Sequence, residues 1–495
     1  MKKTTLIKHH KWLGIVMCVP LLLFGISGIL LNHRHMISHI NVSRAILPPG
    51  YRYTNWNGGL LRGTALCDTI GRHIIIYGSS GMFLSDSTAA TIADFNGGLP
   101  QGAEYRQIRT VVAAGSDSTQ RRLFAVSPLA LYRFGVHGRW HIQRLPLADG
   151  DERLTDAACH GDTLVVLSRS NAYIALPPYR TFRRIDIATP DGHKPTTTLF
   201  RMVWMLHSGE IFGTVGRIAV DTIALLLMAT VVTGGAFFAI RKSRVRTAFK
   251  KVTLKRTLLW HDTIGRRVFA VAMLVCVTGW CLRPPLMIPL AVTSVSPLPL
   301  KSMGSDNPWH DKLRMIRYDS TVGDWLLSTS DGFFALGKCI EQPRATAMSK
   351  TPPVSVMGLN VWEAGTDGTW LCASFAGMYR WNRADGSCTD YFTHKPTPEK
   401  AGAPFGKRAI SGYSCHFASR PVIADYYEGT TLIAQPQWMD CLPMSLWNVA
   451  LEVHSGRMFI GSVATYVFVL VMGAGAIWCL YTGWGARLGR KKKRV

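Results

Sequence analysis

Four long apolar segments constrain this chain more than any other feature of its sequence. They cover Trp12–Asn32, Ile218–Ile240, Val268–Leu282 and Met458–Trp484. A helix needs roughly 20 residues, each rising about 1.5 Å, to cross about 30 Å of hydrocarbon. Three segments meet this length. The third, Val268–Leu282, needs either flanking arginines that extend to the lipid surface or a continuation through Leu286–Val295. The pattern predicts an integral membrane protein with four transmembrane helices.

Histidines and glycines mark a two-fold internal repeat across these segments. One histidine and two glycines recur with the same spacing in the first and third segments, as His10, Gly14 and Gly28 and then as His261, Gly265 and Gly279. A His-Ser-Gly motif precedes the second and fourth segments, at 207–209 and 454–456, and Thr-Gly closes them, at 233–234 and 482–483. The chain therefore divides into two similar halves, 1–247 and 248–495.

The position of the basic residues predicts the orientation in the membrane. The net charge is +26, which in a soluble protein would suggest a nucleic-acid partner. Here the basic runs lie at 2–11, 241–256 and 490–494, the three segments that a four-span protein leaves on one side. This matches the excess of Lys and Arg in cytoplasmic loops and favours contact with anionic lipid over nucleic acid. We expect a bacterial inner-membrane protein with both termini in the cytoplasm.

These observations define nine segments of the chain. The first span has no small-residue cleavage site after it, so we interpret it as an uncleaved anchor. The expected order is a cytoplasmic N-terminus (1–11), the first span (12–32), a periplasmic β-rich region (33–206), a return segment with the second span (207–240), a basic cytoplasmic loop (241–260), the third span (261–283), a second periplasmic β-rich region (284–453), a return segment with the fourth span (454–484) and a basic cytoplasmic tail (485–495).

Both regions between the spans contain short apolar strands separated by turn residues. Strand pairs such as 122–126 with 130–134 recur at roughly 35–50 residues, about three times in each half. This spacing predicts an extracytoplasmic β-propeller of about six blades, shared by both halves. Two separate small β-domains remain the alternative, because strand spacing does not reveal closure. Four tryptophans here are expected mainly in strand cores, with a binding face as the second interpretation: Trp325, Trp362, Trp370 and Trp381.

The repeated histidines are the candidate chemical groups. Sidedness places His10 and His261 near the cytoplasmic face, and His207 and His454 near the outer face. A neutral imidazole from each half could then ligate one haem iron in each leaflet, a bis-imidazole arrangement found in helix bundles. The alternative is that the histidines only support helix packing. No Cys-x-x-Cys-His motif occurs among the eleven cysteines, so covalently attached haem is not indicated.

Two further histidines are alternative ligands at the outer face. His33 and His35 lie just beyond the first span, but the third span has Pro284 at the position that matches His33. This asymmetry favours His207 with His454. If the repeated histidines are ligands rather than packing residues, we expect two haem b groups, one bound by His10 with His261 and one by His207 with His454.

Two sequence motifs resemble the PepSY-associated transmembrane family. Residues 8–14, Lys-His-His-Lys-Trp-Leu-Gly, are similar to its first-helix motif, and residues 206–217, beginning Leu-His-Ser-Gly-Glu, look like its return-helix motif. The family resemblance implies a bacterial inner-membrane protein linked to iron or siderophore uptake, similar to dihaem reductases of periplasmic ferric siderophores. It implies His10 and His207 as haem ligands, with His261 and His454 as their repeat equivalents.

The leading hypothesis is a haem b protein that moves electrons across the inner membrane to a periplasmic acceptor, as in ferric siderophore reduction. The electron donor would be a cytoplasmic partner or a quinol, since the sequence has no Gly-x-Gly-x-x-Gly or other signature for NAD or flavin. Such a protein would be a transmembrane ferric-chelate reductase. The alternative is a non-enzymatic β-domain, anchored in the lipid bilayer, that binds a ligand or a partner in an envelope or uptake assembly.

Overall fold

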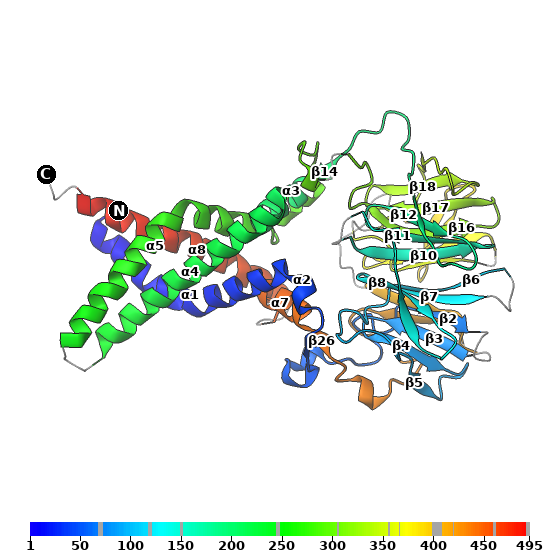
Figure 1. Cartoon of the computed structure of the whole chain (residues 1–495), viewed down its shortest axis with the longest axis horizontal. Helices are drawn as coiled ribbons and strands as arrows, with labels where there is room; N and C mark the ends of the chain where they lie inside the picture. Colours follow the sequence, from blue (N-terminus) through cyan, green and yellow to red (C-terminus); the bar gives the residue numbers. More distant parts are fainter. Residues whose placement is uncertain are drawn as a thin grey trace. The chain divides into compact units, whose positions relative to one another are not determined.

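The computed structural model describes eleven stretches of the chain. They are residues 1–67, 73–116, 121–148, 152–243, 248–303, 306–354, 357–365, 367–397, 408–418, 420–458 and 462–491. These residues form two compact units, a helical one (1–37, 195–306 and 446–495) and a β-rich one (38–194 and 307–445). Each half of the chain therefore contributes to both units (Figure 1).

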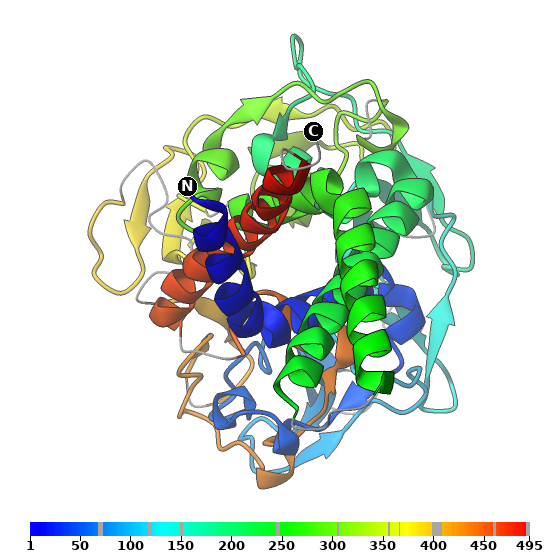
Figure 2. The same cartoon turned by 90° about the vertical axis from the view of Figure 1, so that its left-hand side faces the viewer.

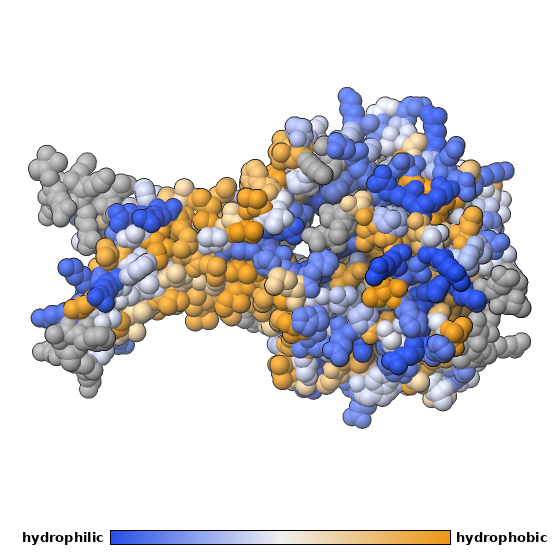
Figure 3. Space-filling model, in the orientation of Figure 1, coloured by the Kyte–Doolittle hydropathy of each residue, from blue (hydrophilic) through white to orange (hydrophobic). Residues whose placement is uncertain are grey.

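Four long helices build the helical unit. They are α1 (Lys3–Asn32), α4 (Gly213–Lys242), α5 (Ala248–Cys281) and α8 (Ser462–Lys491). All four are long and apolar enough to cross a membrane, as the sequence predicts. Apolar side chains dominate their surface in Figure 3. This is the surface expected of helices that face lipid rather than water.

Two helices begin earlier than the hydropathy pattern suggests. Helix α1 begins at Lys3, not at Trp12, and α5 begins at Ala248, not at His261. Most of the expected loop 241–260 is therefore helical. The reason is that Lys and Arg are good helix formers, so a helix continues into its basic flank after the apolar stretch ends. Parts of two basic runs noted in the sequence, at 244–247 and 492–494, lie outside the described residues.

Short helices lead into two of the spans. Helix α3 (Leu199–Ser208) precedes α4, and α7 (Leu446–His454) precedes α8, each ending at the His-Ser-Gly motif. Gly209 and Gly456 have φ of +81° and +76°, a conformation that glycine adopts without steric cost and that stops a helix. The remaining short elements of this unit are α2 (Arg34–Ile37), α6 (Met287–Val292), η4 (Glu210–Phe212), η5 (Lys301–Met303) and the pair β14 (Thr197–Thr198) and β15 (Ser294–Val295).

The long helices associate as two antiparallel pairs, α1 with α8 and α4 with α5. Figure 2 shows both pairs from the end where the chain termini lie. Further contacts join α1 to α4 and α5 to α8. Met17, Met472 and Ala476 pack between α1 and α8, with Phe24 and Cys276 around them. This apolar cluster lies near the middle of α1, between His10 and Gly28 of the repeated pattern.

Antiparallel sheets build the β-rich unit. The first half of the chain supplies three four-stranded sheets: β2 (Gly63–Cys67), β3 (His73–Gly78), β4 (Gly81–Ser85) and β5 (Ile92–Asp94); β6 (Thr110–Ala114), β7 (Arg122–Ser127), β8 (Ala130–Phe134) and β9 (Trp140–Gln143); β10 (Leu154–His160), β11 (Thr163–Ser168), β12 (Ala172–Ala175) and β13 (Arg183–Ile185).

The second half supplies two four-stranded sheets and a two-stranded one: β16 (Leu313–Asp319), β17 (Asp324–Thr329), β18 (Gly332–Gly337) and β19 (Thr346–Ala347); β20 (Val361–Ala364), β21 (Thr369–Ser374), β22 (Gly377–Asn382) and β23 (Cys388–Asp390); β24 (Ile410–Ser414) and β25 (Val422–Asp425). The unit also contains β1 (Asn41–Val42) paired with β26 (Met444–Ser445), and η1 (Arg44–Ile46), η2 (Pro49–Tyr51) and η6 (Gln437–Met439).

The first strands of the six sheets contact one another in a cyclic order. β2 contacts β6 and β24, β10 contacts β6 and β16, and β20 contacts β16 and β24. Side-chain contacts also join the halves. Among them, Arg317 donates to Asp156 at 2.6 Å, and the hydroxyl oxygens of Thr64 and Ser414 lie 2.7 Å apart.

The four tryptophans considered above belong to strand cores. Trp325, Trp362, Trp370 and Trp381 are each at most 3% exposed, so they do not form a surface for binding. Aromatic rings of this size remove a large apolar area from water and dominate the packing of such small sheets. All eleven cysteines are free thiols.

Candidate functional site

The repeated histidines meet in two pairs within the helical unit. His10 on α1 faces His261 on α5, with ring centroids 5.8 Å apart and planes tilted by 54°. His207, near the end of α3, faces His454 at the end of α7, with centroids 6.1 Å apart and planes tilted by 46°. Each pair takes one ring from each half of the chain. These are the two pairings that the internal repeat suggests.

All four rings are oriented by the same hydrogen bond. In each case Nδ1 lies within hydrogen-bonding distance of a main-chain carbonyl oxygen on a neighbouring helix. The bonds are His10 to Cys479 at 2.9 Å, His261 to Thr230 at 2.8 Å, His207 to Val275 at 3.1 Å and His454 to Phe24 at 3.1 Å. Because a carbonyl only accepts, Nδ1 carries the proton and donates. The lone pair of each neutral ring is then on Nε2, the atom suited to ligate a metal.

Each ring lies against a Ser-Gly or Thr-Gly dipeptide on a neighbouring helix. The pairs are Ser27-Gly28 on α1, Thr233-Gly234 on α4, Thr278-Gly279 on α5 and Thr482-Gly483 on α8. In every case the hydroxyl makes its shorter hydrogen bond, of 2.6 to 2.8 Å, with the carbonyl four residues earlier. It also lies 3.0 to 3.2 Å from the carbonyl three residues earlier, which is the carbonyl that the histidine uses. The oxygens of Ser27 and Thr278 also lie 3.1 and 3.2 Å from the Nδ1 atoms of His454 and His207.

The glycine of each pair makes room for the ring. A Cβ added there would lie 2.7 to 3.2 Å from the histidine Cε1 atom: 2.7 Å at Gly279, 2.8 Å at Gly483, 2.9 Å at Gly234 and 3.2 Å at Gly28. Ordinary contact begins at 3.4 Å. Glycine is therefore required so that the imidazole can lie flat against the neighbouring helix. The sequence singled out these glycines by their spacing, but it did not identify which histidine each one would face.

The separation of the paired rings fits ligation of one metal. Two imidazoles that bind a metal from opposite sides through bonds of roughly 2.0 Å have ring centroids about 6 Å apart. The observed 5.8 and 6.1 Å agree with this value. No group of three or more His, Cys, Asp or Glu side chains is placed to hold a metal among the described residues. A pair of neutral imidazoles is a ligand set that haem iron takes, so each of the two histidine pairs would suit that cofactor.

The alternative ligands have other surroundings. His33 places Nε2 2.8 Å from a carboxylate oxygen of Asp221 on α4. Asn32 donates to the other oxygen of Asp221 at 2.8 Å and to the carbonyl of Ser208 at 3.3 Å. His35 is exposed on α2. The structure therefore brings together the four repeated histidines and gives His33 a carboxylate partner instead.

Sequence reasoning missed several residues around these pairs. It noted the Thr-Gly dipeptides only as the ends of spans, and it gave no role to Ser27 or Thr278. The available signal was the identical spacing of 17 residues from His10 to Ser27 and from His261 to Thr278. The carbonyl partners leave no trace in the sequence, because every residue type carries a main-chain carbonyl.

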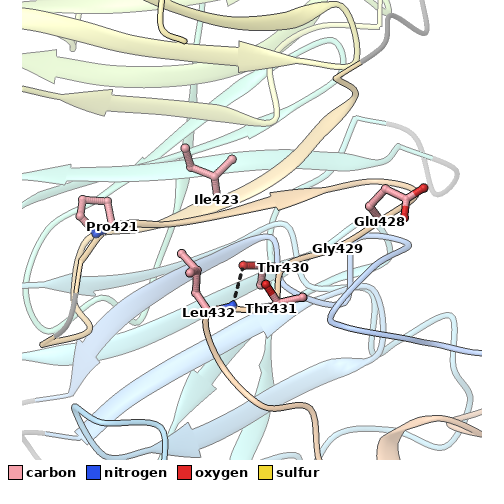
Figure 4. A pocket seen from close by; sticks show the side chains of 7 residues that line it. All are labelled: Pro421, Ile423, Glu428, Gly429, Thr430, Thr431 and Leu432. Carbon is pink, nitrogen blue, oxygen red and sulfur yellow. Dashed lines mark hydrogen bonds between the residues drawn. The ribbon is translucent and has the colours of Figure 1, made fainter.

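A shallow pocket in the β-rich unit has none of these features. It has a volume of about 350 Å³ and is lined by residues of β25 and the segment that follows, among them Ile423, Glu428 and Leu432 (Figure 4). The backbone N–H of Leu432 donates to the hydroxyl of Thr430 within it. Glu428 is its only charged lining residue in the part of the chain that the structure describes. Nothing there orients a reactive group.

The charged network around Arg383 holds strands of the β-rich unit together. Arg383 donates to Asp319 at 2.7 Å and to both oxygens of Asp324 at 2.5 Å. Burial raises the pKa of Asp319, but hydrogen bonds from Arg383 and from the backbone N–H groups of Val322 and Thr321 outweigh it, so the net pKa lies below the usual value. This network closes the turn between β16 and β17.

Comparison with known proteins identifies one family. The model of the PepSY-associated TM region matches residues 7–486, nearly the whole chain. No curated protein matches the chain by sequence.

Two solved structures show weaker similarity. They are the extracellular domains of a putative one component system and of a putative hybrid two component system, both BT4673 from B. thetaiotaomicron. The first has 11% identity and a TM-score of 0.32 over 77% of this chain, and the second has 9% identity and a TM-score of 0.21 over 74%. The matched regions cover 39% and 44% of the lengths of those chains. At these TM-scores neither supports an argument about the fold or the function.

Proposed function

Since the chain belongs to the PepSY-associated transmembrane family, we propose that it is a haem b protein that moves electrons across the bacterial inner membrane. One observation carries the proposal. Two pairs of histidines lie at the separation of bis-imidazole ligation, and all four have Nδ1 held by a main-chain carbonyl. Packing alone would not require the same tautomer and the same glycine contact at four places. Bound haem would supply reversible one-electron chemistry.

The chain's own residues would set the properties of the ligands. A hydrogen bond from Nδ1 to a carbonyl fixes the ring orientation and makes Nε2 a better electron donor to a metal. The Ser and Thr hydroxyl oxygens lie 3.0 to 3.2 Å from the same carbonyls and provide a polar setting around each acceptor. Burial of the rings between apolar helices keeps water away from the ligating atoms and affects the redox potential.

The spacing of the two pairs along the helices suits transfer across the bilayer. On α1, 18 residues separate His10 from Gly28, which contacts His454, and on α5, 18 residues separate His261 from Gly279, which contacts His207. At a rise of 1.5 Å per residue this is roughly 27 Å, close to the hydrocarbon thickness of about 30 Å. With both termini in the cytoplasm, as the basic runs indicate, the His10–His261 pair belongs to the inner leaflet and the His207–His454 pair to the outer one.

The β-rich unit would then lie in the periplasm, and we infer that its six sheets form one six-bladed propeller. The cyclic contacts of the six first strands support this inference. So do the contacts of Arg317 with Asp156 and of Thr64 with Ser414, because they join the two halves at both of their junctions. A ring closed in this way has no exposed edge on its inner strands.

The acceptor we propose is a ferric chelate such as a ferric siderophore, which takes one electron to become ferrous. The donor would be a cytoplasmic partner or a quinol, and the chain would act as a transmembrane ferric-chelate reductase. The resemblance of the return-helix motif to that of iron-uptake members of the family supports this choice of acceptor. The lipid bilayer is the only other partner that the argument requires.

Purified protein in detergent provides the test. We expect low-spin haem b bands in the dithionite-reduced spectrum and about two haems per chain, and we expect ferric chelate to reoxidise the reduced protein faster than it reoxidises free haem. Protein from haem-replete cells that contains no haem would refute the proposal. That result would favour a β-domain anchored in the membrane that binds a ligand or partner. Haem that ferric chelates fail to reoxidise would refute the choice of acceptor alone.

A further inference from the structure

Arg283 lies beside the His207–His454 pair. It follows the end of α5 and lies four residues after Gly279. Gly279 has no side chain, and this allows His207 to approach the helix there. Its positive charge acts on both rings of the pair. Its side chain is only partly accessible to solvent and is surrounded by protein on most sides. A cation therefore stands at one pair of histidines, in a setting where charge is weakly screened.

No carboxylate among the described residues pairs directly with this guanidinium. Its charged neighbours are Arg457 and Glu452, and Glu452 is held by Arg457 through two hydrogen bonds, one of 3.0 Å. Among the described residues, no side chain makes a hydrogen bond or ion pair with Arg283 itself. Residues 263–305, which include Arg283, contain no Asp or Glu. Residues 453–495, which include the fourth span, contain none either.

The other half of the repeat shows what a paired residue looks like at this place. Asn32 occupies the position equivalent to Arg283, four residues after Gly28. Its amide donates to Asp221 and to the carbonyl of Ser208, and Asp221 also contacts His33. The first half thus has an uncharged residue with its hydrogen bonds made. The second half has a charged residue and no partner at the same position.

A partly buried cation without a counter-ion is costly, and arginine binds carboxylates through two parallel hydrogen bonds. We propose that Arg283 binds a carboxylate of the group held between His207 and His454, which for haem b is a propionate. This rests on the proposed function and adds to it a specific anchor for one of the two cofactors. Arg283 is then a positioning residue at that pair, and it biases the electron affinity of that haem through its charge.

The test compares Arg283→Gln and Arg283→Lys with Lys251→Gln as the control, because Lys251 is an exposed cation on the same helix at the end away from this pair. Each full-length protein is titrated spectroscopically between its oxidised and reduced forms, and its haem is quantified. The signal of the relevant haem is identified as the one missing from His207→Ala. Removing a positive charge favours the ferric state, so Arg283→Gln should lower the ratio of reduced to oxidised haem at that signal about tenfold or more at a fixed potential.

Arg283→Lys should restore most of that ratio, since it keeps the charge, and Lys251→Gln should leave it unchanged. The His10–His261 signal should stay the same in all three variants. If the protein binds two haems and Arg283→Gln changes neither their spectra nor their redox titrations, the role of Arg283 is refuted and the proposed function still stands. A protein without haem would overturn both. Equal effects of Arg283→Gln on both haem signals would also contradict the assignment, because they would indicate a general structural change.

Discussion

The glycine that faces His207 offers a sharp perturbation of the site. In Gly279→Ala the new Cβ would lie 2.7 Å from Cε1 and 3.3 Å from Nδ1 of His207. Ordinary contact begins at 3.4 Å, so the ring has to retreat by about 0.7 Å. The bond from Nδ1 to the Val275 carbonyl is already 3.1 Å long and would be lost. Overpacking costs about 1–3 kcal/mol and the hydrogen bond about 1 kcal/mol.

Together these terms predict that haem affinity at this pair falls by roughly 30-fold or more, since about 1.4 kcal/mol corresponds to a factor of ten. Gly265→Ala is the matched control, because it lies on the same helix and its Cβ would meet Thr230 at an ordinary 3.6 Å. Both substitutions gain the same helix propensity, about 1 kcal/mol, so their difference isolates the clash.

The assay is haem retained per chain after gel filtration, read from the reduced spectrum. Gly28→Ala supplies an internal gradation, because its Cβ would approach His454 less closely, at 3.2 Å. The expected order of haem loss is Gly279→Ala, then Gly28→Ala, then Gly265→Ala with none. Equal haem content in Gly279→Ala and Gly265→Ala would refute the idea that the glycine admits a ligating ring.

Three further predictions concern the β-rich unit. Arg383→Met should destabilise it by about 3–5 kcal/mol in urea unfolding followed by tryptophan fluorescence, because two buried carboxylates lose their partner; an unchanged midpoint would contradict this. The lowered pKa of Asp319 contributes stability above about pH 4, its unfolded value, and this contribution should be lost as pH falls through the folded pKa; Asp319→Asn should weaken that acid dependence. An impermeant maleimide added to spheroplasts should label exposed Cys339 and Cys441 but spare Cys372, whose thiol pKa burial raises; labelling only after lysis would refute a periplasmic location.

The sequence predicted the main features of the helical unit because they repeat. Hydropathy located four spans, and the spacing of His10 and His261 and of the two His-Ser-Gly motifs identified two pairs of related histidines. The hydropathy pattern could not locate the starts of α1 and α5. Basic residues that favour a helix have low hydropathy, so the pattern assigns them to loops. The partners of the rings were also inaccessible, because main-chain carbonyls of residues such as Val275 and Phe24 become acceptors only when helices pack.

The asymmetry between the halves needed the structure as well. Comparison of Asn32 with Arg283 in the sequence shows a difference in charge but not its consequence. Only the contacts of Asn32 with Asp221 reveal that one half is internally paired and the other is not. In the β-rich unit, strand spacing anticipated three sheets in each half, whereas the order in which their first strands meet depends on contacts distant in sequence.

The most direct test of the central claim is the haem content of the four single variants His10→Ala, His261→Ala, His207→Ala and His454→Ala beside the unaltered protein. The account predicts about two haems in the unaltered protein and one in each variant. It also predicts that His10→Ala and His261→Ala lose one spectral component while His207→Ala and His454→Ala lose the other. Full haem content in all four variants, or components lost in any other pairing, would contradict it.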